Sequence, residues 1–379
     1  MRAKVLRLLV ALAATSVIAA GCGDDDTDAS AGDTDTEAEE AAATTDLADI
    51  CPSPIVVQTD WFPSPEHAYL YRLTGGEGTV DVETGVYTGP LLDTGVDLEI
   101  RSGGPYLGFQ ATTAIMYQDP DIHLGYISLD EAVQNAAELP TVAVMAPLEI
   151  NPQILMWDPA VHTFESFADI GAGDATVNYF GGATYMDYLV ATGQIRADQA
   201  DGSYDGTPAR FVVEGDLVQQ GFATSEPYRY ENELDDWGKP VDFLLVHDSG
   251  WEIYSQMLSA RPEVVDEFAA CWEAVIPVIQ QSVVDHTVDP DPANQQILAI
   301  VEELATTWEL SAGQMQYSVD TALELGVYGN GPNGTVGDLD PDRVATFVET
   351  AIPVLDGVPA DLDPASLYTN DFIDTAIGF

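Results

Sequence analysis

Apolar residues in the first third of the chain alternate between short continuous runs and segments with helical spacing. Residues 55–61 are predicted to form a strand because β-branched side chains dominate them, and residues 66–73 a short helix that begins after Pro65. Two further strands are predicted at 96–100 and 122–127. Strands that alternate with helices in this way predict a parallel sheet with crossover helices.

A helix start is marked directly after the third strand. Ser128 and Glu131 have the Ser-x-x-Glu spacing of a capping box, in which each side chain accepts a backbone hydrogen bond from the other residue. We therefore expect Ser128 to be the N-cap of a helix.

The same alternation restarts after residue 140. A pair of extended runs at 141–159 precedes a predicted strand, glycine turn and helix in 175–193. From Trp251 the spacing is helical almost to the C-terminus. Residues 209–214 are predicted to form a strand, residues 221–228 a strand and turn, and residues 241–247 a last extended run.

These elements predict an α/β protein of two lobes that are joined by two crossover segments. We assign residues 51–140 and 248–310 to the first lobe and residues 141–247 to the second. Residues 311–379 are predicted to form a helical C-terminal region.

The N-terminus has the pattern of a bacterial lipoprotein signal. Three basic residues precede an apolar stretch that is too short for a permanent span, and small residues lead to Cys22. Residues 1–21 are therefore predicted to be a signal peptide and Cys22 to be lipidated. Residues 22–50 are mostly Asp, Glu, Ala and Thr, which predicts a disordered acidic tether.

Charge is the largest deviation in composition. The chain has 64 Asp and Glu against 11 Lys and Arg, a formal net charge of −53. A field of this sign disfavours nucleic acid and anionic membrane surfaces as partners. The acids are spread along the body without a calcium-loop motif, so we interpret them as a solvated surface suited to saline surroundings, with a metal-binding protein as the alternative. No metal site and no cofactor is predicted.

With Cys22 lipidated, Cys51 and Cys271 remain as an even pair in an oxidising compartment. Either they form a disulfide or they are two independent buried thiols. Neither has a Cys or His neighbour at metal-ligand spacing, so no redox or metal role is assigned.

Candidate ligand-binding residues follow from a rule for open parallel sheets, in which ligands bind beyond the carboxyl ends of strands. Aromatic and polar residues recur at these ends, and such a mixture suits a planar heterocycle held by stacking and edge hydrogen bonds. Ordinary core packing is the alternative role for each aromatic residue. The predicted site comprises Trp61, Phe62, Glu66, His67, Tyr126, Asn178, Tyr179, Glu226 and Tyr228.

Five stretches carry a resemblance to a known family. In chain order they are QTDWFPSPEHAYLY, APLEINPQILMW, GFATSEPYRYENE, VHDSGWEIY and RPEVVDEFAACWEAVIPVIQQS. Together they resemble the bacterial ABC-transporter substrate-binding proteins of the nitrate, sulfonate, taurine and thiamine-pyrimidine-precursor branch. The resemblance implies a type II periplasmic-binding-protein fold, lobe closure on a small molecule, and delivery to an ABC permease and its ATPase. Together with the lipoprotein signal, it predicts a monomer anchored by lipid at the outer face of the cytoplasmic membrane.

In relatives that bind thiamine pyrimidine precursors, residues of the first stretch, QTDWFPSPEHAYLY, contact the heterocyclic ring. By resemblance, Trp61, Glu66 and His67 are expected to contact the ligand. The chain departs from the family at Ala68 and Tyr69, where a Gly or small residue is usual. It also departs at residues 75–95, which replace a basic helix and loop with a lysine-free, insertion-like segment.

Three function classes remain open after this resemblance. The scarcity of cations favours a neutral or cationic heteroaromatic ligand, such as a thiamine pyrimidine precursor, over nitrate, sulfonate or taurine. A pyrimidine-synthase-like enzyme is the second class, but such enzymes resemble one another in a cysteine-rich segment that this chain lacks, so no enzymatic activity is predicted. The third is a surface receptor or adhesin without transport.

Overall fold

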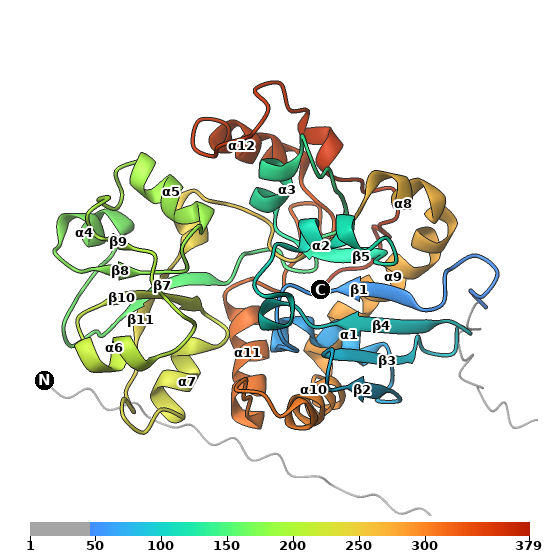
Figure 1. The fold of residues 1–379 in the computed structure, drawn as a ribbon, viewed down its shortest axis with the longest axis horizontal. Coiled ribbons are helices and arrows are strands. Elements are labelled where there is room, and N and C mark those ends of the chain that lie inside the picture. The colour runs from blue at the N-terminus through green and yellow to red at the C-terminus, as the bar shows by residue number, and fades with distance from the viewer. Residues whose placement is uncertain (1–45) are drawn as a thin grey trace, which may run out of the picture. The chain divides into compact units, whose positions relative to one another are not determined.

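The computed structural model describes residues 46–379, whose strands form two β-sheets (Figure 1). The larger sheet has seven strands in the order β2-β3-β4-β1-β5-β12-β6. In it β4, β1 and β5 run parallel, and β12 lies antiparallel between β5 and β6. Its strands are β1 (Ile55–Gln58), β2 (Thr79–Asp81), β3 (Val86–Pro90), β4 (Asp97–Arg101), β5 (Leu124–Ile127), β6 (Val142–Met145) and β12 (Met257–Ala260).

The smaller sheet has five strands in the order β11-β7-β10-β8-β9. Strands β10, β8 and β9 are parallel, while β7 pairs antiparallel with both β10 and β11. Its strands are β7 (Gln153–Trp157), β8 (Val177–Asn178), β9 (Ala200–Asp201), β10 (Val218–Phe222) and β11 (Asp242–Leu245).

Helices cover both faces of the larger sheet. Strand β1 is buried along its whole length, as expected for a parallel strand covered on both faces. Val57 packs in a core with α1 (Ala68–Arg72), α9 (Ala269–Val288) and α10 (Asp291–Leu304). Val56 packs in the other core, whose helices include α2 (Thr112–Gln118), α3 (Leu129–Asn135) and α12 (Pro341–Ala351).

Short helices complete the described chain. Those nearest the smaller sheet are α4 (Phe167–Ala172), α5 (Thr184–Ala191), α6 (Ala209–Glu214) and α7 (Glu226–Asn232). The others are α8 (Pro262–Glu267), α11 (Ala312–Glu324) and the 3-10 helices η1 (Pro65–His67), η2 (Gly104–Leu107), η3 (Val246–Ser249) and η4 (Pro364–Leu367). Within residues 46–379, no helix has both the length and the apolar character needed to cross a membrane.

Two crossover segments join the sheets. Residues 146–152 lead from β6 to β7, and residues 250–256 lead from η3 back to β12. Arg343 of α12 holds both segments, because its guanidinium donates to the carbonyl oxygens of Glu149, Glu252 and Ile253 at 2.8 Å each. It also forms an ion pair with the Glu149 carboxylate at 3.1 Å. The C-terminal region thus fastens the two crossovers to each other.

Two secondary-structure predictions are wrong, and a third, the N-cap at Ser128, is confirmed without the expected capping bonds. Residues 209–214 form helix α6 and not a strand: Phe211 is buried, Val213 is 83% exposed, and Gly215 ends the helix at a φ of 72°. The region after Trp251 is not helical throughout, because β12 interrupts it. Ser128 is the N-cap of α3, but its side chain makes no capping bond, and Glu131 accepts instead from the backbone N–H and hydroxyl of Thr113.

Segment boundaries also differ from the predicted ones. Leu47, which lies in the predicted tether, is 2% exposed and its backbone N–H donates to the Thr94 carbonyl, so Leu47 holds this end of the tether on the body. Strand β6, placed in the second lobe by the predicted division, pairs with β12 in the larger sheet. The insertion-like segment 75–95 forms the β2–β3 hairpin, which extends that sheet beyond β4. The predicted signal peptide, Cys22 and most of the tether lie outside the described residues.

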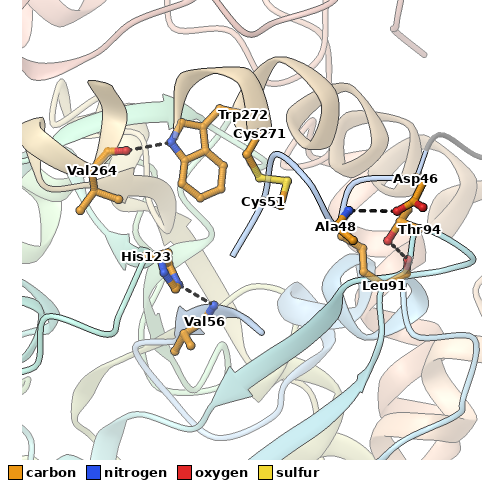
Figure 2. The surroundings of a disulfide bond; sticks show 10 residues. All are labelled: Asp46, Ala48, Cys51, Val56, Leu91, Thr94, His123, Val264, Cys271 and Trp272. Atoms are coloured by element: carbon orange, nitrogen blue, oxygen red, sulfur yellow. Dashed lines mark hydrogen bonds between the residues drawn. A yellow bond between two sulfur atoms is a disulfide. The ribbon is translucent and has the colours of Figure 1, made fainter. Parts of the chain in front are cut away.

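A disulfide joins Cys51 to Cys271, with the two Cα atoms 4.9 Å apart (Figure 2). Cys271 lies in the first turn of α9, where the neighbouring Trp272 donates its indole N–H to the Val264 carbonyl at 3.2 Å. The bond therefore ties the segment that precedes β1 to the helix that covers the larger sheet.

Replacement of Arg343 by Met is expected to lower the free energy of unfolding by about 3 kcal/mol, because three carbonyl oxygens and a carboxylate lose their donor. Urea denaturation at neutral pH measures this loss. Arg72→Met is the matched control, since Arg72 holds only the exposed Asp289, and should cost less than about 1 kcal/mol. Equal losses in the two variants would show that Arg343 has no special role at the crossovers.

His286 makes stability depend on pH. Its side chain is fully buried in α9, and burial lowers its pKa to about 4. In the unfolded chain the pKa of this histidine is about 6.5. Between pH 6.5 and pH 4 the unfolded state therefore binds more protons than the native state. The free energy of unfolding falls as the pH falls through this range. The stability difference between wild type and His286→Leu should therefore change by about 3 kcal/mol between pH 7.5 and pH 4, measured by urea denaturation. A difference that is the same at both pH values would contradict this assignment.

Candidate functional site

A cavity of about 260 Å³ lies between the ends of β1 and β10, one strand from each sheet. Residues that follow β1, residues that follow β10, and Trp308 from the segment between α10 and α11 line it. We call this cavity the aromatic chamber, because five aromatic residues contribute to its wall: Trp61, Phe180, Tyr204, Phe222 and Trp308.

Trp61 is the centre of this aromatic wall. Its ring centroid lies 6.1 Å from Trp308 and 6.4 Å from Phe180, which follows β8 of the smaller sheet. The Trp61 ring is thus contacted by one aromatic residue that follows a strand of the smaller sheet and by one from the segment between α10 and α11. Gly104 allows this placement, because a Cβ there would come within 2.7 Å of the Trp61 ring. Phe62 does not line the chamber but stacks on Trp308 and supports it, with centroids 5.8 Å apart.

Carboxylates form the polar part of the chamber. Glu66, at the start of the first helix, accepts a hydrogen bond from the hydroxyl of Thr224, which follows β10. Glu226, the first residue of α7, accepts from the backbone N–H of Phe222 at 2.6 Å. Burial raises the pKa of Glu226, the nearby Glu66 adds to that rise, and Arg229 opposes it. Trp61, Glu66 and Glu226 are therefore the sequence-predicted residues that the structure places in the chamber wall.

Asp60 is a site residue that the sequence prediction missed. Its carboxylate accepts from the side-chain amide of Gln256 at 3.1 Å and contacts the ring Nε2 of His67 at 3.2 Å. His67 itself is fully buried, so it is not a wall of the chamber but holds Asp60 in place. Gln256 has a left-handed φ of 51°, a strained conformation for a residue with a side chain, at the end of the second crossover.

Besides Phe62 and His67, four predicted residues lie outside the chamber. Tyr126 is buried in the core, where its hydroxyl donates to Tyr69, and burial raises its pKa well above the usual value. Asn178 is buried beside β9, and Tyr179 packs on Tyr185. Tyr228 points to α11, where it packs on Tyr317 with centroids 5.4 Å apart. These residues follow or end strands as predicted, but their side chains face the packed interior or another helix.

The remaining wall residues come from distant parts of the chain. The predicted site includes neither Phe180, nor the three side-chain amides that line the chamber, nor the cation on the second turn of α7. The missed wall residues include Gln153, Tyr204, Gln220, Arg229, Gln256 and Trp308. Of these residues, only Arg229 could have been found from the local sequence, because it lies three positions after Glu226 and so on the same face of α7.

Arg229 is the one cation in the chamber wall, and within residues 46–379 its side chain has no hydrogen-bond or ion-pair partner. Three carboxylates, those of Asp60, Glu66 and Glu226, share that wall. The chamber is therefore acidic overall, with a single guanidinium on the side formed by α7.

A second cavity of about 250 Å³ adjoins the first and shares six wall residues with it. We call it the polar chamber, because most of its wall residues carry a hydroxyl, amide or carboxyl group. The shared residues are Asp60, Gln153, Phe180, Gln220, Phe222 and Gln256. No group of three or more His, Cys, Asp or Glu side chains in residues 46–379 is arranged to hold a metal ion.

Neither protein-family models nor curated proteins match the chain, but solved structures do. The periplasmic aliphatic sulphonate binding protein of Escherichia coli matches with a TM-score of 0.54 and 13% identity, over 83% of this chain and 92% of that one. The ligand-binding component of an ABC-type import system from Staphylococcus aureus, solved with zinc bound, matches with a TM-score of 0.52 and 13% identity, over 84% and 97%.

A third match gives the fold its name. A Candida albicans protein described as having the generic periplasmic binding protein structural fold matches with a TM-score of 0.50 and 12% identity, over 86% of this chain and 98% of that one. This chain has the periplasmic-binding-protein fold. The predicted two-lobed α/β architecture is confirmed, and the two chambers lie between the lobes of a periplasmic-binding-protein fold.

Glu226 should make stability depend on pH in the opposite direction to His286. Because its pKa is raised in the folded state, the native protein holds a proton that the unfolded chain releases, and the free energy of unfolding falls as the pH rises above about 4.5. Glu226→Gln keeps an oxygen acceptor for the Phe222 N–H and removes this dependence, so the variant should gain stability over wild type at pH 8 but not at pH 4. Glu231→Gln, an exposed change on the same helix, is the control for thermal denaturation at both pH values. A pH-independent effect of Glu226→Gln would contradict the expectation.

Proposed function

We propose that the protein is an extracytoplasmic solute-binding protein that captures a small heteroaromatic ligand between its lobes and delivers it to an ABC importer. The observation that supports this function most strongly is the aromatic chamber itself, with aromatic rings and three carboxylates between the lobes of a periplasmic-binding-protein fold. Flat rings bind planar ligands by stacking, and carboxylates accept hydrogen bonds from ring amino groups. A thiamine pyrimidine precursor is one ligand of this class.

Contacts between the lobes support capture by closure. Glu66 and Trp61 belong to the larger sheet's lobe, and their partners Thr224 and Phe180 belong to the smaller sheet's lobe. A ligand that contacts all four would favour the closed arrangement over an open one, because only the closed arrangement offers both walls at once.

The cell-surface part of the proposal rests on the N-terminal sequence. Lipidation of Cys22 would anchor the protein at the outer face of the cytoplasmic membrane, as a monomer that meets its permease and ATPase subunits there. The Staphylococcus aureus protein, a ligand-binding component of an ABC-type import system, supports the same class of partner.

An enzymatic role is not proposed. The pyrimidine-synthase-like alternative would consume a histidine of the protein itself, for which His67 is the candidate. His67 is fully buried behind Asp60 and does not line either chamber. A ligand in the aromatic chamber would meet Asp60 before it met this histidine.

A sulfonate is the second candidate ligand, and Arg229 is the observation that favours it. A guanidinium without a partner in the described residues suits a sulfonate or other anion. The sulphonate-binding protein of Escherichia coli has the same fold and supports this alternative. The three carboxylates of the chamber oppose it unless the ligand also carries a cationic or hydrogen-bond-donating group.

The ligand class is tested by titration calorimetry of the mature chain with cytosine, the aminopyrimidine precursor of thiamine, nitrate, methanesulfonate and taurine. We expect heat with the aminopyrimidines and a loss of about 1 to 3 kcal/mol of binding free energy in Trp61→Ala, since ring stacking is removed. Tyr179→Ala is the matched control, because Tyr179 lies outside the chamber and its removal should leave the affinity unchanged. No heat with any of the five compounds would overturn the proposed function.

Arg229→Gln separates the two candidates. If the ligand is a cationic ring, this change removes the repulsion by Arg229 and the affinity increases. If the ligand is a neutral ring, the affinity is unchanged. If the ligand is a sulfonate, the affinity falls by about tenfold or more, because the charge-assisted hydrogen bond is lost. The same titrations on the variant decide between these outcomes.

A further inference from the structure

The polar chamber has a size and composition of its own. Its volume of about 250 Å³ is close to that of the aromatic chamber, at about 260 Å³. Each is below the range of roughly 300 to 1,000 Å³ typical of ligand pockets, whereas the two together fall within it. A single small ring would fill the aromatic chamber and leave the second one without a function.

The junction between the chambers is formed by the six shared residues, four of which carry a flexible carboxyl or amide side chain. Asp60 stands there with three glutamine amides, of which Gln256 donates to the Asp60 carboxylate. The amide of Gln153 donates to the Gly221 carbonyl at 2.8 Å, and the side-chain oxygen of Gln220 accepts from the Phe180 N–H at 2.6 Å. Amides can turn aside or bond to a ligand that passes between them, so one molecule can occupy both chambers.

The chemistry of the polar chamber is that of a site for hydroxyl groups. Asp130, 9% exposed, lines it and already accepts a hydrogen bond from the hydroxyl of Thr184, across from the other lobe. Ser128 and Asn151 add a hydroxyl and an amide to the wall. The buried polar atoms Ser255 Oγ and Trp251 Nε1 also belong to wall residues, and neither has a hydrogen-bond partner within residues 46–379.

Charge limits what enters this chamber. Its wall includes the carboxyl groups of Asp60 and Asp130 but no Lys or Arg, because Arg229 lines only the aromatic chamber. A phosphate or sulfonate in the polar chamber would therefore face acidic groups without a counter-ion. A neutral group with several hydroxyls would instead donate to the carboxylates and accept from the amides.

We infer that the ligand has two parts: an amino-bearing heteroaromatic ring in the aromatic chamber and a neutral hydroxylated arm in the polar chamber. This inference rests on the proposed solute-binding function and specifies its ligand class. Nucleosides are the simplest probes with this design, since each consists of an aromatic base and a neutral sugar.

Matched pairs of probes test the second part separately from the first. Cytidine should bind about tenfold or more tightly than cytosine to the wild-type chain, because the sugar hydroxyls gain hydrogen bonds to charged groups. Cytidine monophosphate should bind more weakly than cytidine, since its phosphate has no cation in the polar chamber. Adenosine and adenine form a second pair, and titration calorimetry measures all five.

Ala183→Phe fills the polar chamber, because Ala183 lies in its wall with an ordinary backbone conformation at the start of α5. This variant should lose the advantage of the nucleoside over its base while it keeps the affinity for the base. Ala191→Phe makes the same change at an exposed position on the same helix and should behave as wild type. Asp130→Asn removes an acceptor without added volume and should also lower nucleoside affinity selectively, which covers the case in which Ala183→Phe does not fold.

The outcomes separate the two levels of the proposal. If bases bind but nucleosides bind no more tightly, or if the chamber variants weaken base and nucleoside equally, the two-part ligand is wrong and the solute-binding function stands. If no base, nucleoside, aminopyrimidine or sulfonate binds, both are wrong. Selective loss of nucleoside affinity in Ala183→Phe and Asp130→Asn supports the inference.

Discussion

The scarcity of cations is the constraint on which the rest of the structure depends. A chain with 64 acidic residues and 11 basic ones must place each guanidinium where it does most for the fold. Arg343 fastens the crossovers, and Arg261 donates to the carbonyl oxygens of Met116 in α2 and of Pro120 and Ile122 in the loop between α2 and β5. The other paired cations of residues 46–379 are Arg72, Arg101, Arg196, Arg210 and Lys239. Arg229 is left for the cleft, so carboxylates dominate the electrostatics there.

That imbalance couples ligand binding to lobe closure. Burial raises the pKa of Glu226 and the nearby Glu66 adds to that rise, so bringing these two carboxylates together without a ligand between them has an electrostatic cost. A ligand with hydrogen-bond donors or positive charge offsets this cost, and the aromatic contacts of Trp61 and Phe180 then add attraction between the lobes. The same acidic residues that keep the surface solvated thus make closure depend on what fills the cleft.

How far the sequence predicts this molecule is clearest at individual residues. Trp61 and Glu66 could be predicted because they lie in the segment after β1, whose apolar run is visible in the sequence, and Glu226 because it begins the helix that follows β10. Tyr126 lies on a strand that is buried on both faces, so no alternation shows which face its ring takes, and it packs in the core. Gln256 and Trp308 reach the cleft from the return crossover and from the segment after α10, which sequence spacing does not bring together with β1. The six residues of α6 are too few to separate a helix from a strand by periodicity, and β12 lacks the β-branched residues that reveal the other central strands.

The place of β12 in the larger sheet has a consequence for biosynthesis. All strands of the smaller sheet are contiguous in sequence, from β7 to β11, whereas the larger sheet receives β12 only after that whole stretch has been made. In a nascent chain, β5 and β6 therefore each present an unpaired edge until residues 257–260 emerge, and open edges recruit foreign strands. The lobe of the smaller sheet can therefore fold before the lobe of the larger sheet is complete. The four residues of β12 then pair with β5 and β6 and remove the open edges that make the newly made protein prone to aggregate.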